Sequence, residues 1–169
     1  MRNDIRISLV QSPIAWEDKA ANWEAYEKRL ASLKGTTDIA LLPEMFTTGF
    51  SMEAEKLAET NDGETLRRVK AWASDFGMAI AGSFIATEGG KYFNRGFLAE
   101  PSGRITFYDK RHLFRMAGEG QVYTPGKEPC IVSYLEWNIC LQICYDLRFP
   151  VWSRNRGKTY DLLIYMANW

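Results

Sequence analysis

The chain has 169 residues, of which 46% are hydrophobic and 25% charged, and its 21 Lys and Arg balance its 21 Asp and Glu. This composition is typical of a globular protein, and the length suits one domain, which we expect to span residues 1–169. A formal net charge of zero favours neither nucleic acid nor an anionic membrane as a partner. No apolar run approaches the roughly 20 residues needed to cross a bilayer, and the N-terminal residues lack the apolar stretch of a secretory signal.

The first half of the sequence alternates strands and helices. We expect a buried strand over Ile5–Val10, an amphipathic helix over Asp18–Leu33, a short buried strand over Asp38–Leu42 and a second helix over Glu64–Phe76. Gly35 and Gly77 follow the two helices, as glycine often does past a helix C-terminus.

The second half is richer in strands. We expect strands over Met78–Ala86 and Tyr92–Glu100 joined by a hairpin turn at 88–91, then Ile105–Tyr108, Ile131–Leu135, Asn138–Ile143 and Leu162–Met166. A long polar loop over Lys110–Pro129 and a short helical piece near Val151–Arg156 interrupt them. Such a pattern predicts a layered α/β or α+β architecture, with helices covering a sheet.

Three reactive groups follow strands of this pattern directly. Glu44 follows the strand that ends at Leu42, Lys110 follows Ile105–Tyr108, and Cys144 follows Asn138–Ile143. Sites in open α/β sheets are built at the carboxyl ends of strands. Each residue also has an ordinary interpretation taken alone: an inert buried thiol, a surface carboxylate and a solvated turn lysine.

The surroundings of these residues favour chemistry. A strand that breaks into a turn at Cys144 exposes a nucleophile and leaves backbone N–H groups to bind an oxyanion. The apolar neighbours of Glu44 indicate partial burial, which raises the pKa of a carboxyl group and makes it a base near neutrality. A cation at Lys110 would activate the thiol and stabilise an oxyanion. His112, the one histidine, offers an alternative Cys144–His112 pair, which no spacing rule excludes.

The segments around these residues resemble the three catalytic segments of the nitrilase superfamily, the carbon–nitrogen hydrolases, in the same order. They are Leu42–Phe46, Tyr108–Phe114 and Ile143–Pro150, and Gly118-Glu119 resembles the segment of a fourth, supporting glutamate. Residues 43–52, 110–116 and 144–154 are similar to the omega-amidase branch of that superfamily. The resemblance covers the whole chain, which looks like the N-terminal two-thirds of such a protein.

This resemblance implies a four-layer α-β-β-α sandwich that is incomplete at the C-terminus, and a homodimer for a full-length chain. It implies an amidohydrolase that releases ammonia from the terminal amide of 2-oxoglutaramate or 2-oxosuccinamate through a Cys144 thioester. Glu44 would be the base, Lys110 and the backbone N–H of Tyr145 would bind the oxyanion, and Glu119 would orient Lys110 or the substrate amide. No metal or organic cofactor is needed for this chemistry.

Recognition of the substrate carboxylate calls for an arginine. Arg148 is the favoured candidate and Arg115 the second, and we expect Phe46, Tyr123 and Trp169 to line the pocket. Three alternatives stay open: another activity of the superfamily, such as carbamoyl-amine or nitrile hydrolysis, the Cys144–His112 hydrolase, and an inactive fragment that binds ligand. The cysteines Cys130, Cys140 and Cys144 form no CxxC pair, so we expect free thiols in a reducing cytoplasm.

Overall fold

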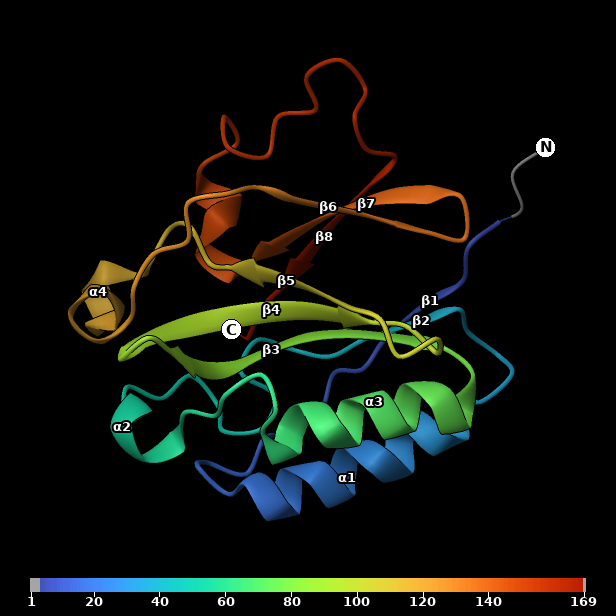
Figure 1. The fold of residues 1–169 in the computed structure, drawn as a ribbon, viewed down its shortest axis with the longest axis horizontal. Helices are drawn as coiled ribbons and strands as arrows, with labels where there is room; N and C mark the ends of the chain where they lie inside the picture. The colour runs from blue at the N-terminus through green and yellow to red at the C-terminus, as the bar shows by residue number, and fades with distance from the viewer. Residues whose placement is uncertain (1–3, 169) are drawn as a thin grey trace.

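A computed structural model describes residues 4–168 and stacks them in layers, with two long helices below a large sheet and a smaller sheet above it (Figure 1). The large sheet has the order β1-β2-β3-β4-β5. Its strands are β1 (Ile7–Leu9), β2 (Ile39–Leu41), β3 (Ala79–Glu88), β4 (Lys91–Ala99) and β5 (Ile105–Asp109). The first three run parallel, while β4 and β5 pair antiparallel, so the carboxyl ends of β2 and β5 both reach the region of the site.

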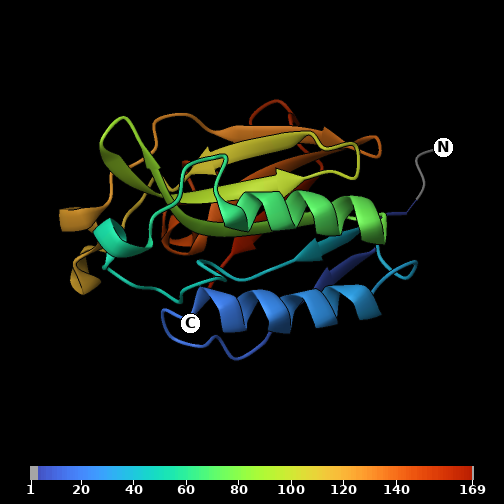
Figure 2. The ribbon, with the colours of Figure 1, turned by 60° about the horizontal axis from the view of Figure 1, so that its bottom comes forward.

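The helices α1 (Lys19–Ser32) and α3 (Glu64–Phe76) lie side by side on one face of this sheet (Figure 2). The Asp18 carboxylate caps α1 by accepting a hydrogen bond from the backbone N–H of Ala21, at 3.0 Å. Gly77 ends α3 in the left-handed conformation, at φ 66°, which a residue without Cβ adopts at little cost. Both predicted helices are therefore confirmed.

Strands β3 and β4 form the predicted hairpin. Glu88 pairs with Lys91, and Gly89 and Gly90 between them have φ values of 56° and 73°. A two-residue turn with two positive φ values matches the right-handed twist of the flanking strands, which explains the pair of glycines.

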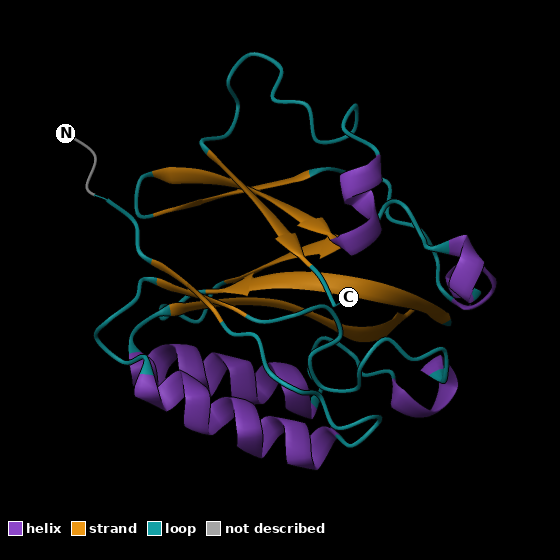
Figure 3. Cartoon of the chain, turned by 180° about the vertical axis from the view of Figure 1, so that it is seen from behind, coloured by secondary structure: helices purple, strands orange, loops and turns teal. Residues whose placement is uncertain are grey.

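The smaller sheet packs on the free face of the larger one, as the view from behind shows (Figure 3). It consists of β6 (Cys130–Tyr134), β7 (Trp137–Ile143) and β8 (Leu162–Met166), with β7 in the centre. A single apolar cluster joins the sheets: Ala81 and Leu98 from the large sheet meet Leu141 and Ile143 from the small one. The two sheets therefore share one apolar core.

Two expectations need correction. The first strand is an edge strand, not a buried one, and Leu9 is 74% exposed. The segment expected to be helical at 151–156 forms turns, and the short helix lies earlier, as the 3-10 helix η2 (Cys144–Arg148). Pro150 separates the two, because the residue before a proline disfavours helical backbone.

Short helices also occur inside the long loop expected at 110–129 and between Leu42 and Glu64, where no element was predicted. They are α2 (Ala54–Leu57), the 3-10 helix η1 (Arg115–Ala117) and α4 (Glu119–Val122). Gly118, at φ 79°, separates the last two and starts α4 at Glu119.

The described residues form three layers of the expected four-layer sandwich. Beyond the small sheet they make turns rather than a helical layer (Figure 1). Within residues 4–168, no helix has both the length and the apolar character that a membrane span requires.

Candidate active site

Glu44 lies just past the end of β2 and is fully buried. The strand β3 fixes the backbone that follows it: the Met45 N–H donates to the Ser83 hydroxyl at 2.8 Å, and the Phe46 N–H donates to the Ser83 carbonyl at 3.2 Å. Met45 has a φ of 47°, an unusual value for a residue with a side chain. These bonds turn the chain sharply at Glu44 and direct its carboxylate inward.

Lys110 follows β5 and is also fully buried. Its ammonium Nζ lies 2.8 Å from Glu44 Oε1 and 3.0 and 2.9 Å from the two carboxylate oxygens of Glu119. The ring of Phe50 lies beneath the ammonium, with its centroid 5.1 Å away. Glu119 is fully buried as well, so two carboxylates share one ammonium out of contact with solvent.

Cys144 stands where β7 turns into η2. Its φ of 43° is left-handed, which is costly for a residue with a Cβ and is typical of a nucleophile held on a tight elbow. Asp146 stabilises this elbow from inside: its carboxylate accepts hydrogen bonds from the Ile143 N–H at 3.1 Å and from the Tyr108 hydroxyl at 2.7 Å.

The electrostatics of Cys144 tie it to the buried charges. Burial, and after it the nearby Glu44 carboxylate, raise the pKa of its thiol to about 12 against the opposing effect of Lys110. The backbone N–H of Asn168 lowers the pKa of the thiol, because a hydrogen-bond donor favours the thiolate. Cys144 is therefore a protonated thiol at neutral pH and needs a base to become a nucleophile.

Glu44 has the properties of that base. Burial raises the pKa of its carboxyl group, and the attraction of Lys110 only partly offsets this effect. For Lys110, burial alone would lower the pKa, but Glu44 and Glu119 outweigh it and raise the value, so the ammonium keeps its charge. No described group meets Glu44 Oε2 at full hydrogen-bond geometry, although the Cys144 thiol is close enough to the carboxylate to act as a donor, which slightly lowers the pKa of Glu44.

His112 has a different set of partners. Its Nδ1 and its backbone N–H both contact the Oδ1 of Asp146, each at 2.8 Å, and its ring stacks on Phe149 with centroids 3.8 Å apart. Among residues 4–168, His112 makes no hydrogen bond with Cys144. The geometry therefore gives the histidine a role in holding the elbow and does not favour a Cys144–His112 pair.

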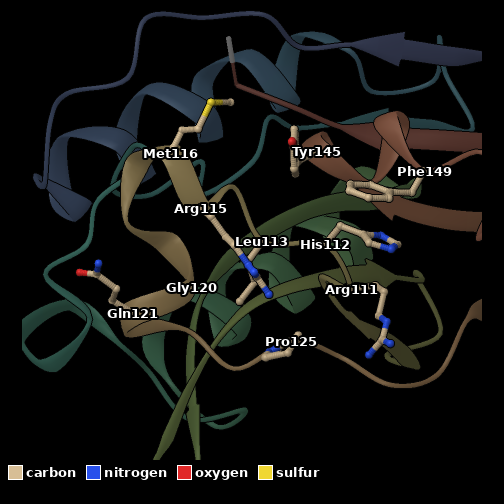
Figure 4. Close-up of a pocket in the computed structure, with 10 residues that line it drawn as sticks. All are labelled: Arg111, His112, Leu113, Arg115, Met116, Gly120, Gln121, Pro125, Tyr145 and Phe149. Carbon is tan, nitrogen blue, oxygen red and sulfur yellow. The ribbon is translucent and has the colours of Figure 1, made fainter.

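A hollow of about 800 Å³ lies beside His112 (Figure 4). Its lining consists of Arg111, His112, Leu113, Arg115, Met116, Gly120, Gln121, Pro125, Tyr145 and Phe149. Three of these directly follow Lys110, Glu119 and Cys144 in the sequence, so the hollow adjoins the buried charges. It contains two arginines and no acidic residue, and it is therefore electropositive.

The residues expected around the substrate have different positions. Arg115 points into the hollow, and Tyr145, the second residue of η2, lines it between the rings of Phe114 and Phe149 (Figure 4). Arg148 is exposed at the end of η2 and does not line the hollow.

Two aromatic residues do not fit the expected pocket. Phe46 is fully buried in the core below the large sheet and packs edge-on against Tyr26, so it does not line a pocket. Tyr123 is buried too, and its hydroxyl donates to the Ser51 carbonyl. Trp169 lies outside the described residues.

Asn94, which was not among the predicted site residues, lies fully buried in β4 and contacts both Glu44 and Glu119. An asparagine inside a predicted strand is unusual and was the one available signal. No group of His, Cys, Asp and Glu side chains among residues 4–168 is arranged to hold a metal ion.

Comparisons with known proteins agree with this architecture. A sequence profile described as carbon–nitrogen hydrolase matches residues 6–169. The omega-amidase YafV of Yersinia enterocolitica is 44% identical over 167 residues, and that of Escherichia coli K12 is 45% identical over 166 residues. Each alignment covers 98% of this chain, which spans 63% of the length of these relatives.

A solved structure is also similar. A CN-hydrolase superfamily protein from Xanthomonas campestris, with an arsenic adduct in its active site, is 43% identical and superposes with a TM-score of 0.96. The alignment covers 99% of this chain and 66% of that one. The fold, the buried Glu44–Lys110–Glu119 cluster beside Cys144 and the match over nearly the whole sequence lead to one conclusion: this chain belongs to the carbon–nitrogen hydrolase family.

Proposed function

We propose that the protein hydrolyses a small amide through a thioester on Cys144. The observation that carries this proposal is the buried ion cluster in which Lys110 bridges Glu44 and Glu119 next to a thiol that is protonated at rest. Burying a charge costs free energy, so the three buried charges of Glu44, Lys110 and Glu119 indicate a functional site. A base, a fixed cation and a nucleophile are the groups that acyl transfer requires.

The reaction begins when Glu44 takes the proton of the Cys144 thiol and the sulfur bonds to the amide carbon. Lys110 and the backbone N–H of Tyr145 stabilise the oxyanion, since the first N–H groups of a helix have no acceptor within it. The carbon–nitrogen bond then breaks, and Glu44 returns the proton to the departing ammonia. A water molecule, deprotonated by Glu44, hydrolyses the thioester and releases the carboxylic acid and the free thiol.

We further propose that the substrate is a 2-oxo dicarboxylic acid monoamide such as 2-oxoglutaramate or 2-oxosuccinamate. Two relatives that match 98% of the chain are named omega-amidases, and the hollow beside the site is electropositive, as a substrate with a free carboxylate requires. The cytoplasm suits this enzyme, because its cysteines are free and Cys144 must stay reduced. A homodimer remains our expectation, which sedimentation would test.

Arg115 is our candidate for binding that carboxylate. The other arginine of the hollow, Arg111, is already engaged: it donates to the Gly126 carbonyl at 3.0 Å and stacks over Trp152 at 5.3 Å. The Arg115 guanidinium points into the hollow and has no hydrogen-bond or ion-pair partner among the described residues (Figure 4). An unpaired guanidinium is suited to bind a carboxylate through two parallel hydrogen bonds.

The first experiment measures ammonia release from 2-oxoglutaramate, glutamine, a carbamoyl amine and a simple nitrile. We expect the 2-oxo acid amide to react fastest, and Cys144→Ala to abolish the reaction. Mass spectrometry of the quenched enzyme should detect an acyl adduct on the Cys144 peptide. If the nitrile or the carbamoyl amine reacts fastest, the proposed substrate class is wrong. If Cys144→Ala still turns over substrate, the reaction does not pass through a thioester on Cys144.

A second experiment tests Arg115. The variant Arg115→Gln should lose about tenfold to a hundredfold in kcat/KM on 2-oxoglutaramate, mainly through KM, the usual scale for a hydrogen bond to a charged group. Hydrolysis of a neutral amide of similar length should be unaffected. Arg111→Gln serves as the matched control and should not discriminate between the two substrates. Equal losses on both substrates would show that Arg115 is structural.

A further inference from the structure

Asn94 lies at the centre of the buried charges although it carries none. Its side-chain nitrogen Nδ2 donates to Glu44 Oε1 at 2.7 Å and to Glu119 Oε1 at 3.1 Å. The residue is fully buried in the middle of β4. One amide group therefore contacts both carboxylates that hold Lys110.

The orientation of this amide is determined by its neighbours. Carboxylate oxygens accept hydrogen bonds, so the NH₂ group of Asn94 must face them. Its oxygen Oδ1 accepts from the Ser83 hydroxyl at 2.9 Å, and that hydroxyl accepts from the Met45 N–H at 2.8 Å. The chain of hydrogen bonds thus starts at the residue after Glu44 and returns to the Glu44 carboxylate.

This arrangement distinguishes the two oxygens of Glu44. Oε1 receives hydrogen bonds from Asn94 and Lys110, whereas Oε2 has no hydrogen-bond partner among residues 4–168. Oε2 is therefore the oxygen that remains available to accept a proton. A second cation in place of Asn94 would also hold Oε1, but it would favour the ionised carboxylate so strongly that the base would weaken.

We propose that Asn94, oriented by Ser83, is a positioning residue that leaves Glu44 Oε2 free to accept the Cys144 proton and keeps Glu119 on Lys110. The inference rests on the roles of Glu44 and Cys144 in the proposed function. It goes beyond that function, because it assigns a task to two uncharged residues on neighbouring strands.

The test measures how fast iodoacetamide alkylates Cys144 as a function of pH, followed on the Cys144 peptide by mass spectrometry. This readout reports the Glu44–Cys144 pair without depending on the natural substrate. Asn94→Leu keeps the approximate volume and removes the donors. The matched control is Asn22→Leu, since Asn22 is also buried and hydrogen-bonds Ala15 and Thr47.

We expect Asn94→Leu to slow alkylation at pH 7 about tenfold or more, the scale of one hydrogen bond to a charged group. The acidic limb of the variant's plot of alkylation rate against pH should move to higher pH, because the ionised Glu44 carboxylate loses a hydrogen-bond donor. Asn22→Leu should lower the melting temperature and leave the pH profile unchanged. A folded Asn94→Leu variant with the wild-type profile, or an equal shift in Asn22→Leu, would overturn the inference.

Ser83→Ala is the milder variant if Asn94→Leu does not fold. Removing the hydroxyl frees the amide of Asn94 to rotate, so we expect a loss of a few-fold and a smaller shift of the acidic limb; an unchanged profile would also overturn the inference. The pH dependence of kcat/KM on an amide should move in the same way. Variants that alter alkylation in a protein that hydrolyses no amide would leave the positioning role intact and refute the proposed function.

Discussion

Lys110 places a compact positive charge between two carboxylates in a space closed to solvent. Its Nζ lies 2.8 Å from Glu44 and 2.9 Å from Glu119, so a small displacement breaks one contact or the other. Lysine presents a point charge, whereas the guanidinium of arginine is a broad plane that cannot occupy the same space.

We therefore predict that Lys110→Arg keeps the charge and loses most activity. The barrier should rise by about 3 kcal/mol or more, the usual scale for one oxyanion donor. The measurement is kcat/KM on the best amide of the panel, with circular dichroism to confirm folding. Activity within a few-fold of wild type in a folded variant would remove Lys110 from the mechanism.

The pH dependence of activity follows from the shifted groups. Glu44 must be ionised to act as a base, and burial raises the pKa of its carboxyl group above the ordinary 4.5, so kcat/KM should rise with pH through a value above 4.5. The Cys144 thiol, with a pKa of about 12, stays protonated, and Lys110 stays charged. We expect a plateau from near neutrality to at least pH 10, whereas a fall between pH 7 and 9 would contradict this assignment.

At the scale of elements, the loop after α4 holds the end of β5 in place. The Gly126 N–H donates to the Lys110 carbonyl at 2.9 Å. A Cβ at Gly126 would lie 2.0 Å from the Asp109 carbonyl oxygen, closer than any atoms can pack. The backbone before Lys110 is therefore packed against a position that admits only glycine.

Gly126→Ala should displace Lys110 and lower both activity and stability. The effect should exceed the roughly 1–3 kcal/mol of ordinary overpacking, because backbone rather than a flexible side chain is in the way. Gly120→Ala is the control: its Cβ would lie 3.5 Å from the Arg115 side chain, an ordinary contact. Thermal melts and ammonia release compare the two, and equal melting temperatures would contradict the expected clash.

At the scale of the whole molecule, the site depends on how the two sheets stack. Glu44 and Lys110 follow strands of the large sheet, while Cys144 follows a strand of the small one. The apolar cluster between the sheets sets their separation. Gly96 of β4 allows this close packing, because a Cβ there would lie 2.9 Å from the end of the Met166 side chain.

Leu141→Ala should weaken this interface. Leu141 is fully buried between the sheets, and truncation of such a residue costs about 2–5 kcal/mol. We expect a lower unfolding midpoint in urea and a slower reaction of Cys144 with iodoacetamide. Leu9→Ala is the control, since Leu9 is 74% exposed, and similar unfolding midpoints for the two variants would argue against a core shared by both sheets.

The sequence by itself determined the two long helices, most strands and the hairpin, and it indicated Glu44, Lys110, Glu119 and Cys144 as the candidate site residues. The reason is that these signals are local. The spacing of apolar residues predicts α1 and α3, and Gly77 predicts the end of α3. The turn at Cys144 is formed by the residues that directly follow it in the chain.

Only the tertiary structure decided which side chains meet. The contact between Lys110 and Glu44 spans 66 positions, and that between Asn94 and Glu44 spans 50. Burial behaves in the same way: Phe46 belongs to the core and Leu9 to the surface, although each has an apolar neighbour in the chain. A side chain's partners are set by the stacking of strands distant in sequence, and no local pattern records that stacking.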